Sequence, residues 1–414
     1  MYAGCTAQTD ALVFKEGKCL LVMKTHRTTR PLKVALLGYG TVGKSVARIL
    51  DERVDEVTLA AILMRPGYTP SDVRMTDSYE TIVCDPTIDV VVECMGGLEP
   101  AHEYLLRALL AGKHVVTSNK AVVAAYFADF VSAGEKSGAA LRIEACVGGG
   151  IPWIAGIEKA KRIDAITSFY GIMNGTTNYI VYSMQKDGTD FAEALGKAQE
   201  LGYAEREPSA DIDGFDVCAK TVISATVAFD TLCTTAVPTS GIRNLTRRDL
   251  AFFSNHGRTV KLFGHGVCED GRYAVAVEPV AVPIESLESH VVSNFNMISL
   301  TGATIGELKF YGQGAGGNPT ANAVVQDIID VARGNYPVYP CARADAPALR
   351  YDPDLLRSSY VIRTNAAIPD STVYEPGAYV VHDITAVQAR ELLEGALKTD
   401  STSFMAALGE RDQS

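Results

Sequence analysis

A glycine-rich turn between a buried strand and a helix constrains the fold of this chain more than any other feature. Residues 33–37 have the apolar run of a buried strand, residues 45–50 continue as a helix, and the pattern Gly-x-Gly-x-x-Gly lies between them. Gly38 allows a tight turn, Gly40 lets a pyrophosphate approach the backbone, and Gly43 permits close packing of the helix. A turn that binds no ligand is the alternative, but the order of strand, glycines and helix favours a dinucleotide-binding turn.

The residues that follow this turn bear on the identity of the cofactor. Thr41 and Val42 lie in the turn that leads into this helix, whose N-terminal amides and positive dipole end suit an anion. The next strand pattern, residues 57–64, ends at Arg65 and has no acidic residue at its end. An acid there would bind the ribose 2′-hydroxyl of NAD, whereas an arginine suits the 2′-phosphate of NADP. Arg65 therefore favours NADP; an arginine without a role, and hence NAD, is the alternative.

Strands and helices alternate from the glycine-rich turn to residue 144. The strand patterns lie at residues 89–94, 114–117 and 141–144, and the helical patterns at residues 100–111 and 121–137. This alternation predicts right-handed parallel crossovers, and hence an α/β fold with a Rossmann-type, doubly wound parallel sheet. Ser118 and Lys120 follow one of the strands, at the carboxyl edge where such sheets bind their ligands.

The remaining chain divides into further units. Long strand patterns mixed with helices predict an α+β domain over residues 151–318, and a helix within 319–335 is expected to return to the dinucleotide-binding domain, 32–150. Several prolines then mark a linker, and residues 345–414 form a small C-terminal α+β unit. Residues 1–31 are an extension, either flexible or an added edge strand.

Charge and composition exclude several kinds of partner. The formal net charge of −11 argues against nucleic acid, because phosphate binding needs a basic surface. No stretch approaches the ~20 apolar residues of a membrane span. Nine cysteines without a Cys-x-x-Cys pair, and seven histidines without ligand spacing, are typical of reduced thiols and argue against a zinc site. With no signal-peptide pattern at the N-terminus, these features predict a cytoplasmic protein.

Residues 202–220 bring together an unusual set of charged side chains. Glu205, Asp211, Asp216 and Lys220 lie in one turn-rich loop and the helix that follows it. Asp216 and Lys220 stand four residues apart and therefore share a helix face. A lysine on a largely apolar helix either extends to water or keeps a carboxylate beside it, because an isolated buried ammonium is costly. A surface ion pair of little energetic importance is the plain alternative.

Six segments occur in the order and spacing of homoserine dehydrogenases, a family that the chain resembles over about residues 33–335. They are the Gly-x-Gly-x-x-Gly turn with its strand and helix, and residues 117–120, 144–152, 174–176, 202–220 and 314–320. The resemblance implies an NAD(P)-dependent oxidoreductase that interconverts L-homoserine and L-aspartate 4-semialdehyde in threonine, methionine and isoleucine biosynthesis. It also implies a homodimer formed through the second domain.

The resemblance assigns the proton chemistry to two lysines. Lys220 would be the acid/base lysine at the carbinol oxygen, with Asp216 orienting it or balancing its charge. Lys120, between cofactor and substrate, is the second candidate for proton transfer. Oxidation of a carbinol needs a base for the hydroxyl proton, and a lysine serves only if its pKa is lowered. Two lysines in one pocket are expected to lower each other's pKa.

The resemblance also assigns the residues that would bind the amino acid. Glu205 and Asp211 would receive the substrate ammonium, and Gly175 and Thr176 would contact the amino acid. A zwitterion needs an anion for its ammonium and amide donors for its carboxylate, so these residue types suit the task.

Further residues match the family's cofactor and cation sites. Gly316 resembles a loop glycine beside the nicotinamide, and Ser118 stands where an alanine is commoner. The family's monovalent cation site, where sodium is a structural ligand, is matched by one carboxylate and three backbone carbonyls, those of Glu144, Val147, Gly149 and Ile151.

The C-terminal unit departs from the family pattern. Longer members end in an ACT regulatory domain that can bind threonine, but the tail after Tyr360 lacks the Asp-x-Pro-Gly turn and the helix expected after the first ACT strand. Residues 379–397 and 404–407 resemble the later strand, helix and strand. We therefore expect a shortened ACT-like unit, with dimer contacts or simple packing against the enzyme as the alternatives.

Two other functions compete with this assignment. One is an oxidoreductase for another amino acid or semialdehyde on the same sheet. The other is a dinucleotide-sensing protein with an inactive catalytic domain, which the retention of both lysines and all three acids disfavours.

Overall fold

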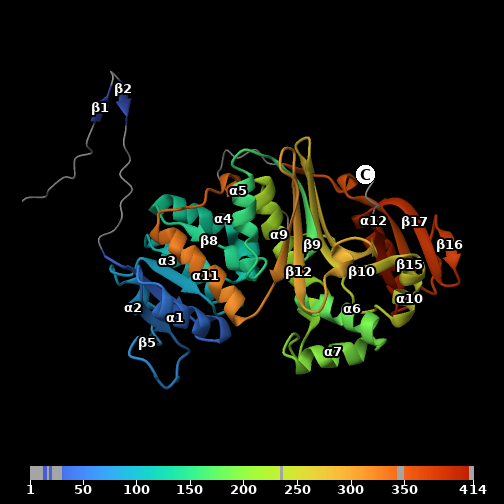
Figure 1. Ribbon diagram of the computed structural model, residues 1–414, viewed down its shortest axis with the longest axis horizontal. Coiled ribbons are helices and arrows are strands. Elements are labelled where there is room, and N and C mark those ends of the chain that lie inside the picture. The colour runs from blue at the N-terminus through green and yellow to red at the C-terminus, as the bar shows by residue number, and fades with distance from the viewer. Residues whose placement is uncertain (1–12, 16–17, 21–29, 234–235, 343–348, 410–414) are drawn as a thin grey trace, which may run out of the picture.

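Two sheets of different character lie along the long axis of the molecule (Figure 1). The computed structural model describes residues 13–15, 18–20, 30–233, 236–342 and 349–409. The blue and cyan part of the chain forms a parallel sheet with its helices, and the green, yellow and red parts form a larger mixed sheet. Within these ranges, no helix combines the length and apolar character that a bilayer span requires.

The first sheet has the strand order β5-β4-β3-β6-β7-β8, and every neighbouring pair is parallel. Its strands are β3 (Leu32–Leu37), β4 (Val57–Leu63), β5 (Met75–Thr76), β6 (Val90–Glu93), β7 (His114–Thr117) and β8 (Leu141–Arg142). The chain starts in the middle of the sheet at β3, runs outward to β5, and then returns to build the other half from β6. The predicted doubly wound sheet is confirmed.

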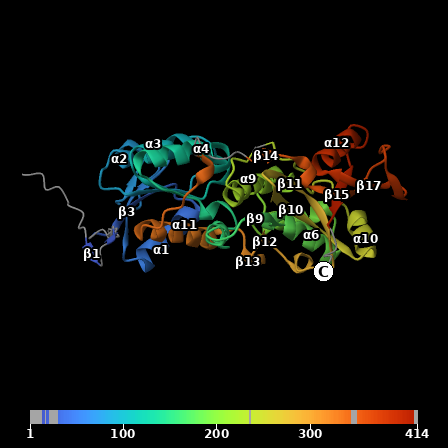
Figure 2. The ribbon, with the colours of Figure 1, turned by 90° about the horizontal axis from the view of Figure 1, so that it is seen from above.

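Helices cover both faces of this sheet, as the view from above shows (Figure 2). They are α1 (Thr41–Arg53), α2 (Glu80–Val83), α3 (Ala101–Leu110), α4 (Lys120–Ser137) and α11 (Gly317–Ala332). Val46 of α1 and Val324 of α11 pack with Leu36, whereas Leu105 of α3 packs on the other face with Leu37. Successive residues of β3 point to opposite faces, so this buried strand needs apolar residues at nearly every position.

The second sheet has ten strands among the described residues, in the order β13-β12-β9-β10-β11-β18-β15-β17-β16, with β14 paired to β11. Its first part comprises β9 (Ile166–Ile172), β10 (Arg258–Glu269), β11 (Arg272–Pro283), β12 (Phe295–Gly302), β13 (Gly306–Gln313) and β14 (Arg350–Tyr351). The accompanying helices are α5 (Trp153–Ala160), α6 (Gly175–Asp187), α7 (Phe191–Glu200), α8 (Ser209–Ile212), α9 (Phe215–Phe229) and α10 (Arg247–Asn255).

Helix α9 is the buried centre of this second domain. It crosses β10 so closely that a β-carbon on Gly264 would lie 2.2 Å from Thr221 Oγ1 and 2.9 Å from a methyl group of Val217. The helix carries buried, mostly apolar residues on almost every side, as expected for a helix enclosed between a sheet and neighbouring helices. This close packing fixes the position of the polar residues that α9 carries.

The C-terminal unit continues the second sheet. It comprises β15 (Arg357–Arg363), β16 (Thr372–Glu375), β17 (Ala378–Thr385), α12 (Ala386–Leu397) and β18 (Phe404–Leu408). β18 pairs in parallel with β11, where Val280 lies opposite Ala407, and in antiparallel fashion with β15. A short segment, residues 364–371, joins β15 to β16 without a helix.

The structure differs from the sequence-based expectations in several local details. The strand expected over 141–144 ends at Arg142, because Glu144 begins a 3-10 turn. Strand β13 was not expected, and its last residue, Gln313, directly precedes the glycine-rich segment 314–320. In the N-terminal extension, β1 (Val13–Lys15) and β2 (Lys18–Leu20) pair with each other, and the rest of 1–29 lies outside the described residues.

Candidate active site

The glycine-rich turn has the geometry that its sequence predicts. Gly38 has a φ of +93°, and a β-carbon there would lie 2.9 Å from the carbonyl oxygen of Cys94. A β-carbon on Gly43 would lie 2.2 Å from the carbonyl oxygen of Gly38, so only glycine allows α1 to start this close to the turn. Gly40, in contrast, has open space around it. That space lies at the helix start, where an anion would be received.

A second helix begins beside the first. Helix α11 starts at Gly317, where a β-carbon would lie 2.9 Å from Thr41 Cγ2, and Arg48 Nη2 donates to Asn318 Oδ1 at 3.0 Å. The residue before it, Gly316, has a φ of +122°. Among the described residues, no side chain caps the first turn of α1 or α11, and neither first turn holds an acid. Two positive helix ends therefore meet at the carboxyl edge of the sheet, which suits an anionic dinucleotide.

Residues at the ends of the central strands complete this edge. Arg65 is exposed just beyond β4. Ser118 follows β7, and its amide donates to the carbonyl oxygen of Glu93 at 3.3 Å. The Glu93 side chain, which the sequence analysis did not single out, is fully buried and accepts from the amides of Met95 and Gly96 and from Thr117 Oγ1. It thereby fixes the loop after β6; the only signal in the sequence is an acid that ends an apolar strand.

Two lysines from the two domains meet on one carboxylate. Lys120 is the first residue of α4, and its Nζ lies 3.0 Å from Asp216 Oδ1. Lys220 lies in α9, and its Nζ donates to Asp216 Oδ2 at 2.7 Å and to the carbonyl oxygen of Met173 at 2.6 Å. The side chains of Lys220 and Asp216 are 9% and 8% exposed, whereas that of Lys120 is 39% exposed. The surface-pair alternative for Asp216 and Lys220 is therefore wrong.

Asn174 ties a second carboxylate to this cluster. Its Nδ2 donates to Asp211 Oδ1 at 2.7 Å and to Asp216 Oδ2 at 2.8 Å, while its Oδ1 accepts from the amide of Thr177 and caps α6. No role for Asn174 was predicted from the sequence. Its place before Gly175, at the start of a helix, was the available signal for a cap but not for a bridge between two distant acids.

The charges in this cluster shift one another's ionisation. Burial raises the pKa of Asp216, but the ammonium groups of Lys220 and Lys120 lower it more, so its pKa lies well below the usual range. Asp216 in turn raises the pKa of Lys120. Burial, together with the charge of Asp216, raises the pKa of Asp211. The expectation that the lysines lower each other's pKa is therefore wrong for Lys120, because the carboxylate between them outweighs their repulsion.

The other predicted substrate residues lie around the same cluster. Gly175 and Thr176 form the first turn of α6, and Thr176 Oγ1 donates to the carbonyl oxygen of Tyr203 at 2.5 Å. This contact brings the loop that carries Glu205 beside α6. The Glu205 side chain itself is exposed and makes no ion pair with another described residue, so a contact with substrate stays a prediction for Glu205.

The residues matched to a cation site lie between the two domains. Both carboxylate oxygens of Glu144 accept backbone amides, from Ile154 at 3.1 Å and from Ala155 at 2.7 Å. Burial raises the pKa of Glu144 to about 7, against the lowering effect of these amides. The carbonyls of Val147, Gly149 and Ile151 follow in a tight turn with two left-handed glycines. Carboxylate and carbonyl oxygens are the donors that a hard cation such as sodium prefers, so the donor set fits.

These features define a class of protein. The first domain has a sheet edge suited to a dinucleotide. The cluster of Lys120, Asp216 and Lys220 joins this edge to the second domain. The site thus combines backbone donors that suit an anionic cofactor with two ammonium groups and two carboxylates, the group types that proton exchange and recognition of a small amine require. It is the site of a nicotinamide-dependent oxidoreductase that acts on a small polar substrate.

Comparisons with known proteins identify the family. The model described as "Homoserine dehydrogenase, NAD binding domain" matches residues 38–144, and the model described as "Homoserine dehydrogenase" matches residues 152–329. The chain is 36% identical to the homoserine dehydrogenase of Bacillus subtilis, over 73% of each chain, and 38% identical to that of Corynebacterium glutamicum, over 72% of each. The crystal structure of a homoserine dehydrogenase from Thiobacillus denitrificans superposes with a TM-score of 0.80 at 29% identity, covering 92% of this chain and 99% of that one.

The chain belongs to the homoserine dehydrogenase family. Its function is accordingly the NAD(P)-dependent interconversion of L-homoserine and L-aspartate 4-semialdehyde. This step leads toward threonine, methionine and isoleucine. The family resemblance found in the sequence is confirmed.

Proposed function

We propose that the cluster of Lys120, Asp216 and Lys220 is the catalytic centre for this oxidation and reduction, with NADP as the preferred cofactor. The observation that carries the proposal is the meeting of two ammonium groups from different domains on one buried carboxylate. The cofactor-binding edge belongs to the domain of Lys120, so a substrate at the cluster lies between cofactor and Lys220. The surface arginine Arg65, at the end of β4, supports NADP over NAD.

Lys220 exchanges the proton at the carbinol oxygen. A nicotinamide bound at the glycine-rich turn would supply the hydride acceptor for oxidation of the carbinol carbon and the hydride donor for reduction. In oxidation Lys220 takes the hydroxyl proton in its neutral form; in reduction its ammonium donates a hydrogen bond and then a proton to the aldehyde oxygen. Asp216 orients Lys220 and balances its charge. Lys120, whose pKa is raised, remains an ammonium near the reacting oxygen and is the second candidate for proton transfer.

The amino-acid end of homoserine is bound by the loops around α6 and α8. Asp211 and Glu205 receive the ammonium group. Gly175 and Thr176, at the start of α6, offer amide donors and a positive helix end to the carboxylate. Asn174 holds Asp211 in a fixed relation to the proton-exchanging lysine, which sets the distance between the ammonium and the carbinol of the substrate.

Several finer assignments belong to the same proposal. Glu144, with the carbonyls of Val147, Gly149 and Ile151, holds a monovalent cation, which we take to be sodium, and the cation stabilises the junction of the two domains. The enzyme is a cytoplasmic homodimer that associates through its second domain. The C-terminal unit is a shortened ACT-like unit: its strand order, β18-β15-β17-β16, supports this, and the helix-free segment 364–371 argues against threonine binding.

The decisive measurement is the initial rate of NADPH formation from L-homoserine and NADP⁺ at mildly alkaline pH, repeated with NAD⁺ and with added threonine. We expect a higher kcat/KM with NADP⁺ and no inhibition by threonine. Lys220→Ala should reduce kcat by at least about 10²-fold, the range typical of a lost general acid or base. Folded protein without turnover on homoserine would contradict the activity, and a fully active Lys220→Ala variant would contradict the catalytic assignment alone.

A further inference from the structure

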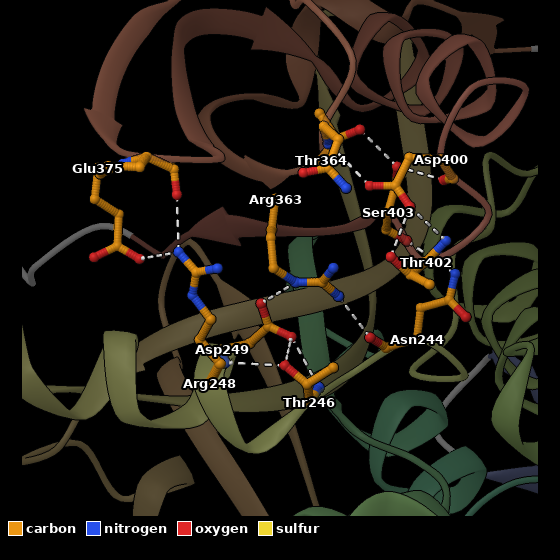
Figure 3. Close-up of polar contacts among 12 residues, drawn as sticks. Asn244, Thr246, Arg248, Asp249, Arg363, Thr364, Glu375, Asp400, Thr402 and Ser403 are labelled. Carbon is orange, nitrogen blue, oxygen red and sulfur yellow. Dashed lines mark hydrogen bonds and ion pairs between the residues drawn. The ribbon is translucent and has the colours of Figure 1, made fainter.

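A polar network joins the C-terminal unit to the second domain beside helix α10 (Figure 3). Arg363 of β15 reaches across the junction, and its Nε lies 2.6 Å from Asp249 Oδ1. The other oxygen of Asp249 accepts from the amide and hydroxyl of Thr246 and thus closes the capping box of α10. The side chains of Arg363 and Asp249 are 14% and 5% exposed, so this ion pair is shielded from solvent. The junction is therefore a built contact and holds α10 against β15.

Asn244, three residues before α10, binds across this junction through both its side chain and its backbone. Asn244 Nδ2 donates to two carbonyl oxygens of the turn before β18, those of Ser401 at 2.9 Å and Ser403 at 3.0 Å. The carbonyl oxygen of Asn244 accepts from Arg363 Nη2 at 2.8 Å. Asn244 is thus held by side chain and backbone, and only an amide side chain of this length offers both donor hydrogens to the turn.

The segment that leads to Asn244 lies directly against α8. A β-carbon on Gly241 would lie 2.0 Å from the carbonyl oxygen of Ile212, and the amide of Ile242 donates to that same oxygen at 2.8 Å. Arg243 binds Asp213, the residue after α8, through both carboxylate oxygens at 2.7 and 2.6 Å. Arg243 Nη2 also donates to Ser209 Oγ, at the start of α8, at 2.9 Å. One arginine therefore spans α8 from end to end.

Helix α8 carries Asp211, which Asn174 links to Asp216. Its four residues make a single turn, and so short a helix has too few internal hydrogen bonds to hold its own position. Its geometry must come from the groups packed against it. Resting on the function proposed above, we propose that Arg243 and Asn244 are positioning residues through which the C-terminal unit holds α8, and with it Asp211, in place for the substrate ammonium.

The C-terminal unit thus contributes to substrate binding, and this contribution does not require the unit to bind an effector. Movement of α8 displaces Asp211 but not the glycine-rich turn, which lies in the other domain. Loss of the brace therefore weakens homoserine binding and leaves cofactor binding unchanged. Misplacement by about 1 Å at such a site costs up to about 10²-fold in rate, so a partly relaxed α8 should raise the KM for homoserine by about five- to tenfold.

The test compares two substitutions at the same junction. Asn244→Ala removes both donors to the turn before β18. Arg248→Ala is the matched control: Arg248 Nη2 contacts Glu375 Oε1 at 3.3 Å and the carbonyl oxygen of Pro376 at 2.8 Å, but it has no contact with α8 in the described structure. KM for homoserine, KM for NADP⁺, kcat and Tm are measured for both. We expect Asn244→Ala alone to raise the homoserine KM, with the NADP⁺ KM within twofold of wild type.

A second pair of variants covers the case in which Asn244→Ala fails to fold. Arg243→Gln removes an exposed ion pair and should raise the homoserine KM, whereas Arg243→Lys should recover part of that loss because it keeps the charge. An unchanged homoserine KM in Arg243→Gln, or equal rises in both KM values, would overturn the inference. Wild-type protein without homoserine turnover would instead overturn the proposed function, so the two failures are distinguishable.

Discussion

Replacing Asp216 with asparagine tests the electrostatic account of the site. The substitution keeps the shape of the side chain and removes the charge that the two ammonium groups share. Lys220, 9% exposed and 2.7 Å away, then lacks a counter-charge, whereas Lys120 is 39% exposed and can be solvated. Breaking a buried ion pair typically costs about 3–5 kcal/mol, and an exposed one contributes little. We therefore expect a loss of about 3 kcal/mol, or roughly 6–12 °C in Tm for a domain of about 200 residues.

The second substitution in this test removes the charge left behind. Asp216→Asn/Lys220→Met has no unpaired ammonium in α9, so it should recover at least half of the lost Tm although it is equally inactive. Tm by differential scanning calorimetry at pH 7.5 and steady-state kinetics are the measurements. Glu278→Gln is the control: Glu278 is also buried, and its Oε1 accepts from Tyr360 OH at 3.1 Å, but it lies outside the candidate site. It should lower Tm and keep kcat/KM within twofold.

The pH dependence of this effect has a definite sign. The pKa of Asp216 is lower in the folded protein than its ordinary value of about 3.9, so its stabilising effect is complete above that pH and is lost as the pH falls further. The Tm difference between wild type and Asp216→Asn should therefore be nearly constant from pH 7 down to about pH 5 and should shrink as the pH falls below about 3.9. Two results would refute the reasoning. One is a Tm for Asp216→Asn within ~2 °C of wild type at pH 7.5, because ~2 °C is the smallest shift that 1 kcal/mol produces. The other is a double variant that is less stable than the single one.

Three further predictions concern the cofactor and the cation. If the open space at Gly40 receives the pyrophosphate, as proposed, Gly40→Ala should leave Tm unchanged but raise the KM for NADP⁺ about tenfold or more. Gly43→Ala should instead lower Tm by forcing a clash, at a typical cost of about 1–3 kcal/mol. Arg65→Ala should raise the KM for NADP⁺ by about 10-fold or more and leave that for NAD⁺ unchanged, as expected for a lost charge-assisted hydrogen bond. Replacing sodium by choline at equal ionic strength should lower the Tm of wild type but not of Glu144→Gln; equal responses would argue against the cation site.

Local sequence patterns were sufficient for much of the fold. Gly43 is required by its close approach to Gly38, five residues earlier, and Gly38 by its positive φ, so the dinucleotide-binding turn follows from the local sequence, although Cys94 also limits the space at Gly38. The alternation of buried strands and helices through residue 137 likewise identified the doubly wound sheet. Asp216 and Lys220, four apart on one helix, were expected to face each other and do so at 2.7 Å.

Contacts between distant segments were not accessible in the same way. Asn174 bridges two acids that lie 37 and 42 residues further along the chain, and nothing in its immediate sequence distinguishes a bridging amide from a helix cap. The predicted direction of the pKa shift of Lys120 was wrong for a related reason. Charges of both signs lie at the site, and only the distances between them decide which interaction is larger. Short strands such as β16 leave too little periodicity to be recognised.

The parallel pairing of β18 with β11 bears on how the protein matures during synthesis. β11 ends at Pro283 and β18 begins at Phe404, yet the two are hydrogen-bonded neighbours inside one sheet. While the ribosome is still extending the chain, β11 presents an unpaired edge to solvent, and such edges attract strands of other chains. A chaperone that shields this edge, or slow translation that prolongs its exposure, should therefore affect the yield of native enzyme more than its final stability.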